Sequence, residues 1–292
     1  MRRRLKAIAP YIYTLPAAAL VLGVLMYAWG QSFILSFTQY RPMMGIGPKF
    51  TGIQNYVTLL NQPLFRKAIW VSFVFTGISV LLECVFGMLI ALLLMQVTRG
   101  LAFIRTSLLI PLMIAPALAG LIWKLFFNAE FGFLNYFLGL FGVPGQLWLS
   151  SEALVLPSII LVDIWRETPF VAIFMYAGLQ ALPNDPFEAA RIDGATAWQA
   201  WRYITIPLLR PLLGIVVLFR VIFALRVFDT AFVLAREGGP GQNAMVLGMY
   251  LYERTYKTFD LGLASAVSFI ILALTLVFGA VFITFIYREV EF

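Results

Sequence analysis

The fold class follows from one stretch of the chain, Ile69-Trp-Val-Ser-Phe-Val-Phe-Thr-Gly-Ile-Ser-Val-Leu-Leu-Glu-Cys-Val-Phe-Gly-Met-Leu-Ile-Ala-Leu-Leu-Leu-Met-Gln-Val97. Glu83 is its one formally charged side chain. About 20 such residues are enough for a helix to cross the roughly 30 Å of hydrocarbon in a bilayer. Because lipid offers the backbone no hydrogen-bond partners, we predict that this stretch is a transmembrane helix.

Five further apolar stretches of similar length occupy most of the remaining chain. Of the 292 residues, 62% are hydrophobic and 12% are charged, whereas soluble domains are about half apolar and a quarter charged. We therefore predict an all-α integral membrane protein with six transmembrane helices, formed as a single domain of residues 1–292. The spans are expected at residues 11–37, 69–97, 106–127, 154–179, 208–234 and 261–287.

The residue types that support most enzyme chemistry are missing from the sequence. The chain has no His and one Cys, Cys84, which excludes an internal disulfide, the usual zinc ligands and a Ser-His-Asp triad. It also lacks a Gly-x-x-x-x-Gly-Lys-Ser/Thr phosphate-binding loop, so nucleotide is expected to bind to another polypeptide. No catalytic residue, metal site or cofactor is predicted in this chain.

The positions of Lys and Arg predict which side of the membrane each loop faces. Cytoplasmic loops carry an excess of these residues, so the dense basic cluster at the N-terminus places that end inside, and six spans then place the C-terminus inside as well. This topology puts ten basic residues inside (Arg2, Arg3, Arg4, Lys6, Arg99, Arg105, Arg191, Arg202, Arg210 and Arg288) and seven outside (Arg41, Lys49, Arg66, Lys67, Arg236, Arg254 and Lys257). The net charge of +7 is thus attributed to membrane topology and not to nucleic acid binding.

The longest polar segment on the predicted cytoplasmic side is residues 183–207, Pro-Asn-Asp-Pro-Phe-Glu-Ala-Ala-Arg-Ile-Asp-Gly-Ala-Thr-Ala-Trp-Gln-Ala-Trp-Arg-Tyr-Ile-Thr-Ile-Pro. Asp185 is placed to cap a helix with a proline at its first position, and Glu188 follows three residues after the cap. Gly194 then breaks the chain before a second short helix over residues 195–204. A connector needs only about six residues, so we predict that this helix-turn-helix docks onto a partner. Local signals also allow a plain connector in which Glu188 is merely a capping carboxylate.

Six residues of this segment have the spacing of a known motif: Glu188, Ala189, Ala190, Gly194, Ile204 and Pro207. They resemble the EAA loop of the permease subunits of binding-protein-dependent ABC importers. The string Glu-Ala-Ala-Arg-Ile-Asp-Gly-Ala is similar to the carbohydrate-uptake branch of that family. Further matches are Gly52-x-x-Asn-Tyr56, Arg226-Val-Phe-Asp229 and Gly238-Gly-Pro240, whereas Arg236-Glu237 departs from the family pattern in a predicted outer loop.

The resemblance implies that the chain is the permease subunit of an ATP-driven importer and does not hydrolyse ATP itself. Residues 183–207 would form a coupling loop seated on a cytoplasmic ATPase subunit, with Glu188 paired to a basic residue of that partner. The residues expected at this contact are Glu188, Ala189, Ala190, Asp193, Gly194, Ile204 and Pro207.

The resemblance also implies partners, a location and a class of substrate. The expected partners are a second permease subunit, two ATPase subunits that bind ATP and Mg, an extracytoplasmic sugar-binding protein and membrane lipid. The expected location is the cytoplasmic membrane of a bacterium or archaeon. The substrate is expected to be a sugar, and the exit of the fifth span resembles permeases for α-linked disaccharides such as trehalose or maltose.

Ionisable residues inside the spans are the candidates for the substrate path. A charge at the centre of a transmembrane helix costs about 2.5–3.5 kcal/mol, so such residues should face protein or water. Carboxylates, guanidinium groups and aromatic rings suit the hydroxyls and apolar faces of sugars. The predicted path comprises Asp163, Arg166, Glu167, Phe170, Arg220 and Phe223.

The same charges also allow a structural interpretation, as ion pairs that join helices. We favour this interpretation for Glu83, and for Arg226 and Asp229, which are i, i+3 neighbours and are predicted to form an ion pair. Lys124 lies near the end of its span and is expected to reach toward the membrane surface.

Other function classes remain open at this point. The arginines allow an anionic substrate such as a glycerol phosphate. A secondary transporter driven by an ion gradient would also use buried charges, but the sequence has no evident inverted repeat, and the docking loop would have no purpose. A membrane-embedded transferase would need a carboxylate-rich catalytic loop or a metal box, and a purely structural subunit would not need charges at mid-membrane.

Overall fold

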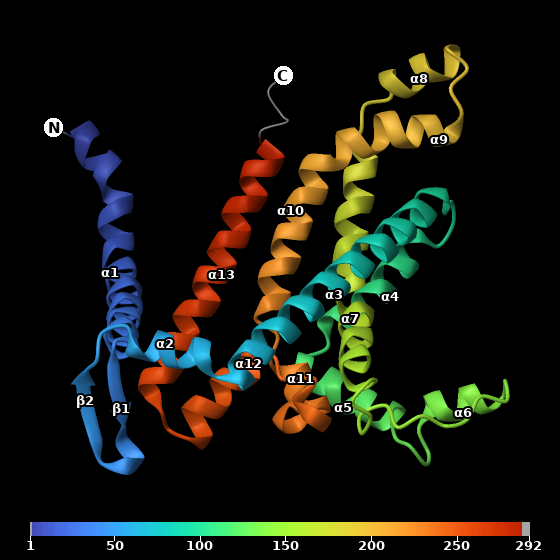
Figure 1. Ribbon diagram of the computed structural model, residues 1–292. Helices are drawn as coiled ribbons and strands as arrows, with labels where there is room; N and C mark the ends of the chain where they lie inside the picture. The colour runs from blue at the N-terminus through green and yellow to red at the C-terminus, as the bar shows by residue number, and fades with distance from the viewer. Residues whose placement is uncertain (1, 288–292) are drawn as a thin grey trace. The chain divides into compact units, whose positions relative to one another are not determined.

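Figure 1 shows the computed structural model, which describes residues 2–287. Arg288, predicted to lie in the cytoplasm, falls outside the described residues. The helices are α1 (Arg2–Ser36), α2 (Gln54–Asn61), α3 (Pro63–Gln96), α4 (Leu101–Met113), α5 (Pro116–Phe126), α6 (Phe133–Gly139), α7 (Val155–Gln180), α8 (Asp185–Ile192), α9 (Ala197–Ala200), α10 (Ile206–Leu225), α11 (Asp229–Leu234), α12 (Leu247–Tyr252) and α13 (Leu261–Tyr287). The strands are β1 (Thr38–Arg41) and β2 (Ile46–Phe50).

Four described helical stretches are long and apolar enough to cross a membrane. They are Leu15–Ser36 of α1, all of α3, Ala197–Leu225 through α10, and Leu261–Phe282 of α13. The bent pair of α4 and α5 is a fifth candidate. Helix α7 has 26 residues and is long enough, but it carries three charged side chains in its middle. The mostly helical membrane fold agrees with the prediction, and the count of six spans stays a prediction.

Two of the predicted spans are broken. The third was predicted as one helix over residues 106–127, but α4 and α5 meet at 94°. Pro116 disfavours the helical conformation in the residue before it, and Ala115 is accordingly extended, with φ −56° and ψ 137°. The fifth span was predicted to run to residue 234, but α10 ends at Leu225 and Phe228 is non-helical, with φ −142° and ψ −61°.

By its internal contacts, the described chain divides into two compact units. One contains α1, the β-hairpin, α2 and residues 251–270, and the other contains residues 63–250 and the chain from residue 271 onward. The single domain predicted from the sequence stays a prediction.

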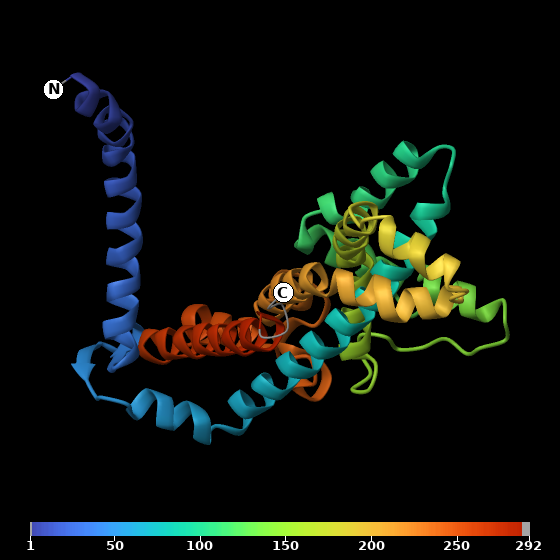
Figure 2. The same ribbon diagram turned by 90° about the horizontal axis from the view of Figure 1, so that it is seen from above.

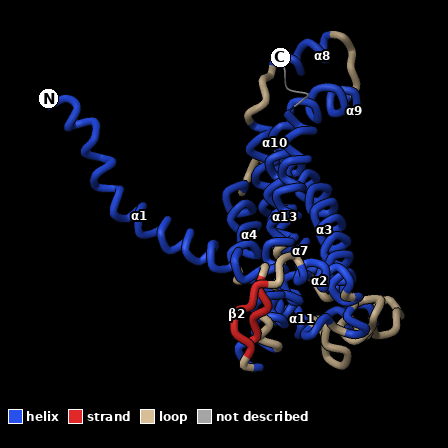
Figure 3. Tube along the Cα trace, turned by 60° about the vertical axis from the view of Figure 1, so that its left-hand side comes forward, coloured by secondary structure: helices blue, strands red, loops and turns tan. Residues whose placement is uncertain are grey.

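The first unit contains a β-hairpin that was not predicted from the sequence. Strands β1 and β2 pair antiparallel, with Thr38 opposite Phe50 (Figure 3). Asn55, from the Gly-x-x-Asn-Tyr segment, donates from its amide to the carbonyl oxygens of Ser36 and Thr38, at 2.9 and 2.8 Å. This segment therefore fixes the turn that follows α1.

The second unit is built around α3, α7 and α10, which pack side by side (Figures 1 and 2). Helices α3 and α7 approach closely at Gly87, where a Cβ atom would lie 2.6 Å from the Cβ atom of Val171. Small residues at such contacts let transmembrane helices pack closely. Helices α8 and α9 lie beyond the same end of α7 and α10, because the segment that contains them joins these two helices (Figure 1).

Candidate functional site

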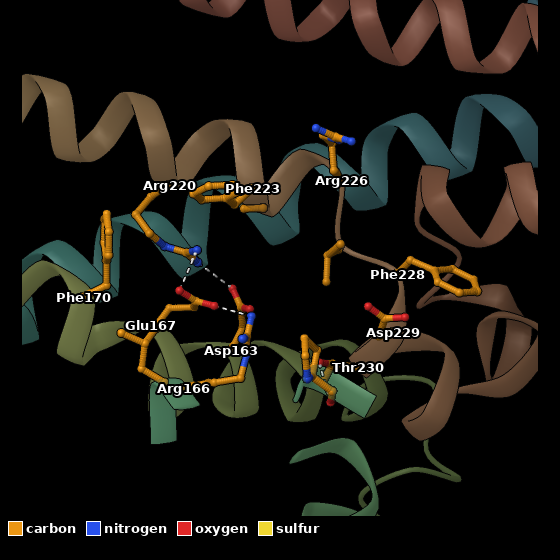
Figure 4. Close-up of a pocket in the computed structure, with 14 residues that line it drawn as sticks. Asp163, Arg166, Glu167, Phe170, Arg220, Phe223, Arg226, Phe228, Asp229 and Thr230 are labelled. Carbon is orange, nitrogen blue, oxygen red and sulfur yellow. Dashed lines mark hydrogen bonds and ion pairs between the residues drawn. The ribbon is translucent and has the colours of Figure 1, made fainter. Parts of the chain in front are cut away.

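A cavity of about 510 Å³ lies in the second unit, beside α7 and α10 (Figure 4). This volume is within the roughly 300–1,000 Å³ of small-molecule sites. All six side chains predicted for the substrate path line this one space, and their contact with a substrate stays a prediction. The lining residues are Leu112, Pro116, Asp163, Arg166, Glu167, Phe170, Arg220, Phe223, Ala224, Arg226, Val227, Phe228, Asp229 and Thr230.

Arg220 is the centre of a buried group of charges, Glu83, Asp163, Arg166, Glu167 and Arg220, which we call the ion cluster. The Nε and Nη2 atoms of Arg220 donate to the two carboxylate oxygens of Glu83, at 2.6 and 2.8 Å. Nη2 also donates to Oδ2 of Asp163 at 3.1 Å, and Nη1 lies 3.1 Å from Oε2 of Glu167 (Figure 4). Glu167 pairs in turn with Arg166. Pairing of this kind offsets the free-energy cost of removing the charges from water.

The ion cluster leaves few donors of Arg220 for a ligand. Arg220 has five N–H groups, and its four contacts to carboxylates leave one of them over. Arg220 is 1% exposed and Glu83 is 0% exposed. Arg166 is different, because its Nε atom is buried without a hydrogen-bond partner in the described structure. Of the arginines that line the cavity, Arg220 has most of its N–H groups engaged by carboxylates, whereas the Nε–H of Arg166 is unpaired.

The predicted ion pair between Arg226 and Asp229 is not formed. Both residues are described, and they make no ion pair with each other; their side chains point in different directions in Figure 4. The prediction assumed a continuous helix, in which residues i and i+3 are neighbours. The helix ends at Leu225, and the chain turns before Asp229 begins α11, so this spacing does not apply.

Aromatic rings complete the wall of the cavity. Phe170 contacts Phe174 with ring centroids 4.6 Å apart, and Phe223 stacks on Phe219 at 6.4 Å. Phe223 is 53% exposed, so its ring face is available. The cavity therefore offers apolar ring faces beside carboxylates and guanidinium groups, an arrangement that suits a polar solute with hydroxyl groups.

The predicted coupling loop forms a helix-turn-helix, α8 and α9. Gly194 turns the chain with φ +73°, a conformation in which a side chain is strained. The backbone N–H of Ala195 then bonds to the carbonyl of Ala190 at 2.9 Å, which closes the end of α8. Glu188, Ala189, Asp193 and Gly194 are exposed, as are large side chains such as Ile192 (87%) and Trp198 (65%). The loop thus presents both a carboxylate and apolar groups at its surface.

Two local predictions for this loop are wrong. The predicted cap at Asp185 is instead the first helical residue, because the carbonyl of Asn184 already accepts the backbone N–H groups of Phe187 and Glu188. The second helix was predicted as a separate helix over residues 195–204, but the helix that starts with α9 (Ala197–Ala200) continues through a π-helical turn at Trp201–Thr205 into α10. Pro207 accounts for this π-helical turn, because in a regular α-helix its ring would clash with the backbone carbonyl of Tyr203, four residues earlier.

The start of α9 carries a cap that is readable in the sequence but was not predicted above. Thr196 and Gln199 form a reciprocal capping box at the start of α9, in which the backbone N–H of Gln199 donates to Thr196 Oγ1 at 3.3 Å. A Thr followed three residues later by Gln is the usual sequence sign of this cap. No comparable sequence pattern indicates that Glu83 pairs with Arg220, because helical spacing does not reveal which faces of two helices are in contact.

The chain is similar to known proteins over most of its length. The family described as "Binding-protein-dependent transport system inner membrane component" matches residues 58–291. The "Probable ABC transporter permease protein y4oQ" of Sinorhizobium fredii is 38% identical over 98% of this chain and 93% of its own length. The "Trehalose/maltose transport system permease protein MalF" of Thermococcus litoralis is 34% identical over 94% of this chain and 92% of its own.

A solved structure has the same fold. It is a bacterial alginate ABC transporter in complex with an alginate pentasaccharide-bound periplasmic protein, and one of its chains superposes with a TM-score of 0.84. The match covers 100% of this chain and 98% of that chain, at 21% identity.

Proposed function

Because this chain belongs to the family of binding-protein-dependent transport system inner membrane components, we propose that it provides half of the path by which an ATP-driven importer carries a sugar across the membrane. It is a multi-pass membrane protein and the permease subunit of an ABC importer, not an enzyme. Membership in this family is incompatible with the ion-coupled secondary transporter that the sequence left open.

The main support for the proposal is the connection between the cavity and the coupling loop. Helix α7 lines the cavity with its middle and α10 with its last two turns, and the two helices are joined at their other ends by the exposed helix-turn-helix of α8 and α9. A displacement of this coupling loop therefore acts directly on the two helices that hold the cavity charges. Such a connection is what an importer driven by an external ATPase needs.

The chemistry of the cavity supports a neutral, hydroxyl-rich substrate. Counted as ionised, the cavity wall and the ion cluster carry four acids and three bases: Glu83, Asp163, Glu167 and Asp229 against Arg166, Arg220 and Arg226. An excess negative charge disfavours an anionic solute in a low-dielectric site. The similarity to a trehalose/maltose permease points the same way, so we propose an α-linked disaccharide such as trehalose or maltose.

A glycerol phosphate is the second candidate. It is favoured by Arg166 and Arg226, which both line the cavity; in the described structure Arg226 makes no ion pair with a carboxylate. The engagement of Arg220 by three carboxylates weakens this candidate, because the most deeply placed arginine is not free to bind phosphate.

The proposed importer has the partners and topology that the sequence suggested. A second permease chain completes the path, and two cytoplasmic ATPase subunits bind ATP and Mg beneath the coupling loops. A sugar-binding protein docks from outside, and both termini of this chain lie in the cytoplasm of a bacterial or archaeal cell. Closure of the ATPase pair opens the cavity outward, the sugar enters, and hydrolysis returns the cavity to its inward-facing state.

The test is uptake by the importer purified with its partner subunits and reconstituted into liposomes. We expect uptake of radiolabelled trehalose or maltose that requires both ATP and the binding protein, and none of sn-glycerol 3-phosphate. Uptake of glycerol phosphate alone would select the second candidate. Uptake without ATP, or purification of this chain without an ATPase, would refute the proposal.

The topology has its own test. A single cysteine at position 188, in a chain with Cys84 replaced by serine, is expected to react with a membrane-impermeant maleimide only in inside-out vesicles. Reaction from the outside of intact cells would place the coupling loop on the wrong side for an ATPase.

A further inference from the structure

Glu83 is not one of the residues that line the cavity, but it contacts one that does. Its two carboxylate oxygens accept the Nε and Nη2 hydrogens along one edge of the Arg220 guanidinium. The Nη2 and Nη1 atoms of Arg220 also contact Asp163 and Glu167, respectively. Glu83 therefore sets the position from which Arg220 reaches the two acids of α7.

The ion cluster joins the two helices that carry the coupling loop. Thirteen residues separate Glu167 from the end of α7 at Gln180, and fourteen separate the start of α10 at Ile206 from Arg220. At 1.5 Å per residue each distance is about 20 Å of helix. The loop is thus joined to the cluster through two helices, α7 and α10, of which α10 is continued by the π-helical turn into α9.

Helix α3 is fixed to these two helices by the same cluster and by the packing next to it. Gly87 lies one turn after Glu83, and Val171 lies one turn after Glu167. Gly87 packs directly against Val171, because a Cβ atom added at Gly87 would lie only 2.6 Å from the Cβ atom of Val171. Beyond them toward the loop, the fully buried Ala91 and Met175 belong to a packed apolar cluster that also includes α10. An ionic contact and an apolar contact therefore lie on consecutive turns.

We propose that Glu83 is a positioning residue for energy coupling: it holds Arg220 so that α3, α7 and α10 move as one body when the coupling loop is displaced. The inference rests on the proposed function, because it assigns the cluster a part in passing the ATPase motion to the cavity. Glu83 acts through Arg220 and has no contact with the substrate.

The choice of glutamate follows from geometry. A carboxylate offers two acceptor oxygens in one plane, which match the Nε and Nη2 donors of an arginine. Glutamine has the same size but presents one oxygen and one NH₂ group, so one N–H of Arg220 would face another donor. Arg220 would then no longer be fixed relative to α3, while its contacts to α7 could persist.

The test compares the number of sugar molecules imported per ATP hydrolysed in Glu83→Gln and in the wild type. The reconstituted importer is supplied with saturating binding protein, and radiolabelled trehalose and maltose are the probes. We expect a ratio about tenfold lower in Glu83→Gln, a size typical of altered coupling. Glu83→Asp, which keeps the carboxylate, is expected to lie between the two.

Ser79→Ala is the matched control. Ser79 lies one turn before Glu83 on α3, is 0% exposed, and has a hydroxyl without a hydrogen-bond partner in the described structure. We expect this variant to keep the wild-type ratio. An equal loss in Ser79→Ala and Glu83→Gln would overturn the proposal, because any polar change within α3 would then have the same effect.

A wild-type ratio in Glu83→Gln also overturns the proposal. If Glu83→Gln does not assemble with its partner subunits, Glu83→Asp is measured in its place. A wild-type ratio in Glu83→Asp would then also overturn the proposal. Failure of the proposed function is distinguishable, because the wild-type importer itself would then import no sugar. Failure of this inference leaves import by the wild type intact.

Discussion

Replacement of Arg220 by methionine tests whether the ion cluster stabilises the membrane domain. Methionine keeps the unbranched apolar stem and removes all four contacts to carboxylates. Glu83 and Asp163, which are 0% and 4% exposed, would then have no cation beside them, whereas Glu167 would keep Arg166. Removing one partner of a buried ion pair costs about 3–5 kcal/mol.

This loss converts to a measurable shift in thermal stability. For a domain of this size about 1 kcal/mol changes the unfolding temperature by roughly 2–4 °C, so we expect a decrease on the order of 10 °C. The assay heats the purified importer in detergent and measures the remaining intact complex by size-exclusion chromatography. Unfolding under these conditions is irreversible, so the comparison is made at one heating time.

Arg226→Met is the matched control, because Arg226 lines the same cavity and makes no ion pair with any described residue. Its replacement should change stability by no more than about 1 kcal/mol. The double variant Glu83→Gln, Arg220→Met should recover part of the loss, because Glu83 no longer leaves a buried charge. Equal losses in Arg220→Met and Arg226→Met would refute the reasoning.

Three further predictions concern the coupling loop and the hairpin of β1 and β2. Gly194→Ala forces a side chain into a φ of +73°, at a cost of about 1 kcal/mol, and should reduce sugar-stimulated ATP hydrolysis. Gly142→Ala, with φ +75° in the turn after α6, should not, and equal effects would contradict the assignment. Glu188→Ala should lower both uptake and stimulated ATP hydrolysis at least about tenfold, as expected for a lost charge-assisted contact, whereas Asp185→Ala should leave both near wild type. Asn55→Ala removes two hydrogen bonds, at 2.9 and 2.8 Å, and should destabilise the hairpin by about 1–3 kcal/mol, seen as faster external proteolysis; an unchanged cleavage rate would argue against this role.

The features that were predictable from sequence are those that depend on residues close in the chain. Long apolar stretches identify membrane helices because hydrocarbon leaves the backbone no other choice. Asp163 and Glu167 share a helix face by their spacing alone, and both contact Arg220 in the structure. Gly194 marked the turn between α8 and α9 because its backbone conformation is costly for other residues.

Other features depend on contacts that spacing does not report. The bond between Glu83 and Arg220 joins residues 137 positions apart, and helical periodicity does not state which faces of α3 and α10 meet. No proline or glycine marks the end of α10 at Leu225 in the sequence. The ion pair between Arg226 and Asp229 was therefore predicted from helical spacing, although the helix is interrupted between these residues. The strands of the hairpin have four and five residues, too short for a clear alternating pattern.

The position of Arg220 late in the chain has a consequence for biosynthesis. Asp163 and Glu83 leave the ribosome 57 and 137 residues before the arginine that neutralises them. At a synthesis rate of about 5–20 residues per second, Arg220 is made roughly 3–11 s after Asp163 and roughly 7–27 s after Glu83. We therefore expect nascent α3 and α7 to stay beside the insertion machinery until α10 arrives. A nascent chain stopped after residue 205 should then be extracted by alkaline carbonate more readily than one stopped after residue 235, and equal extraction would show that both acids tolerate lipid without the arginine.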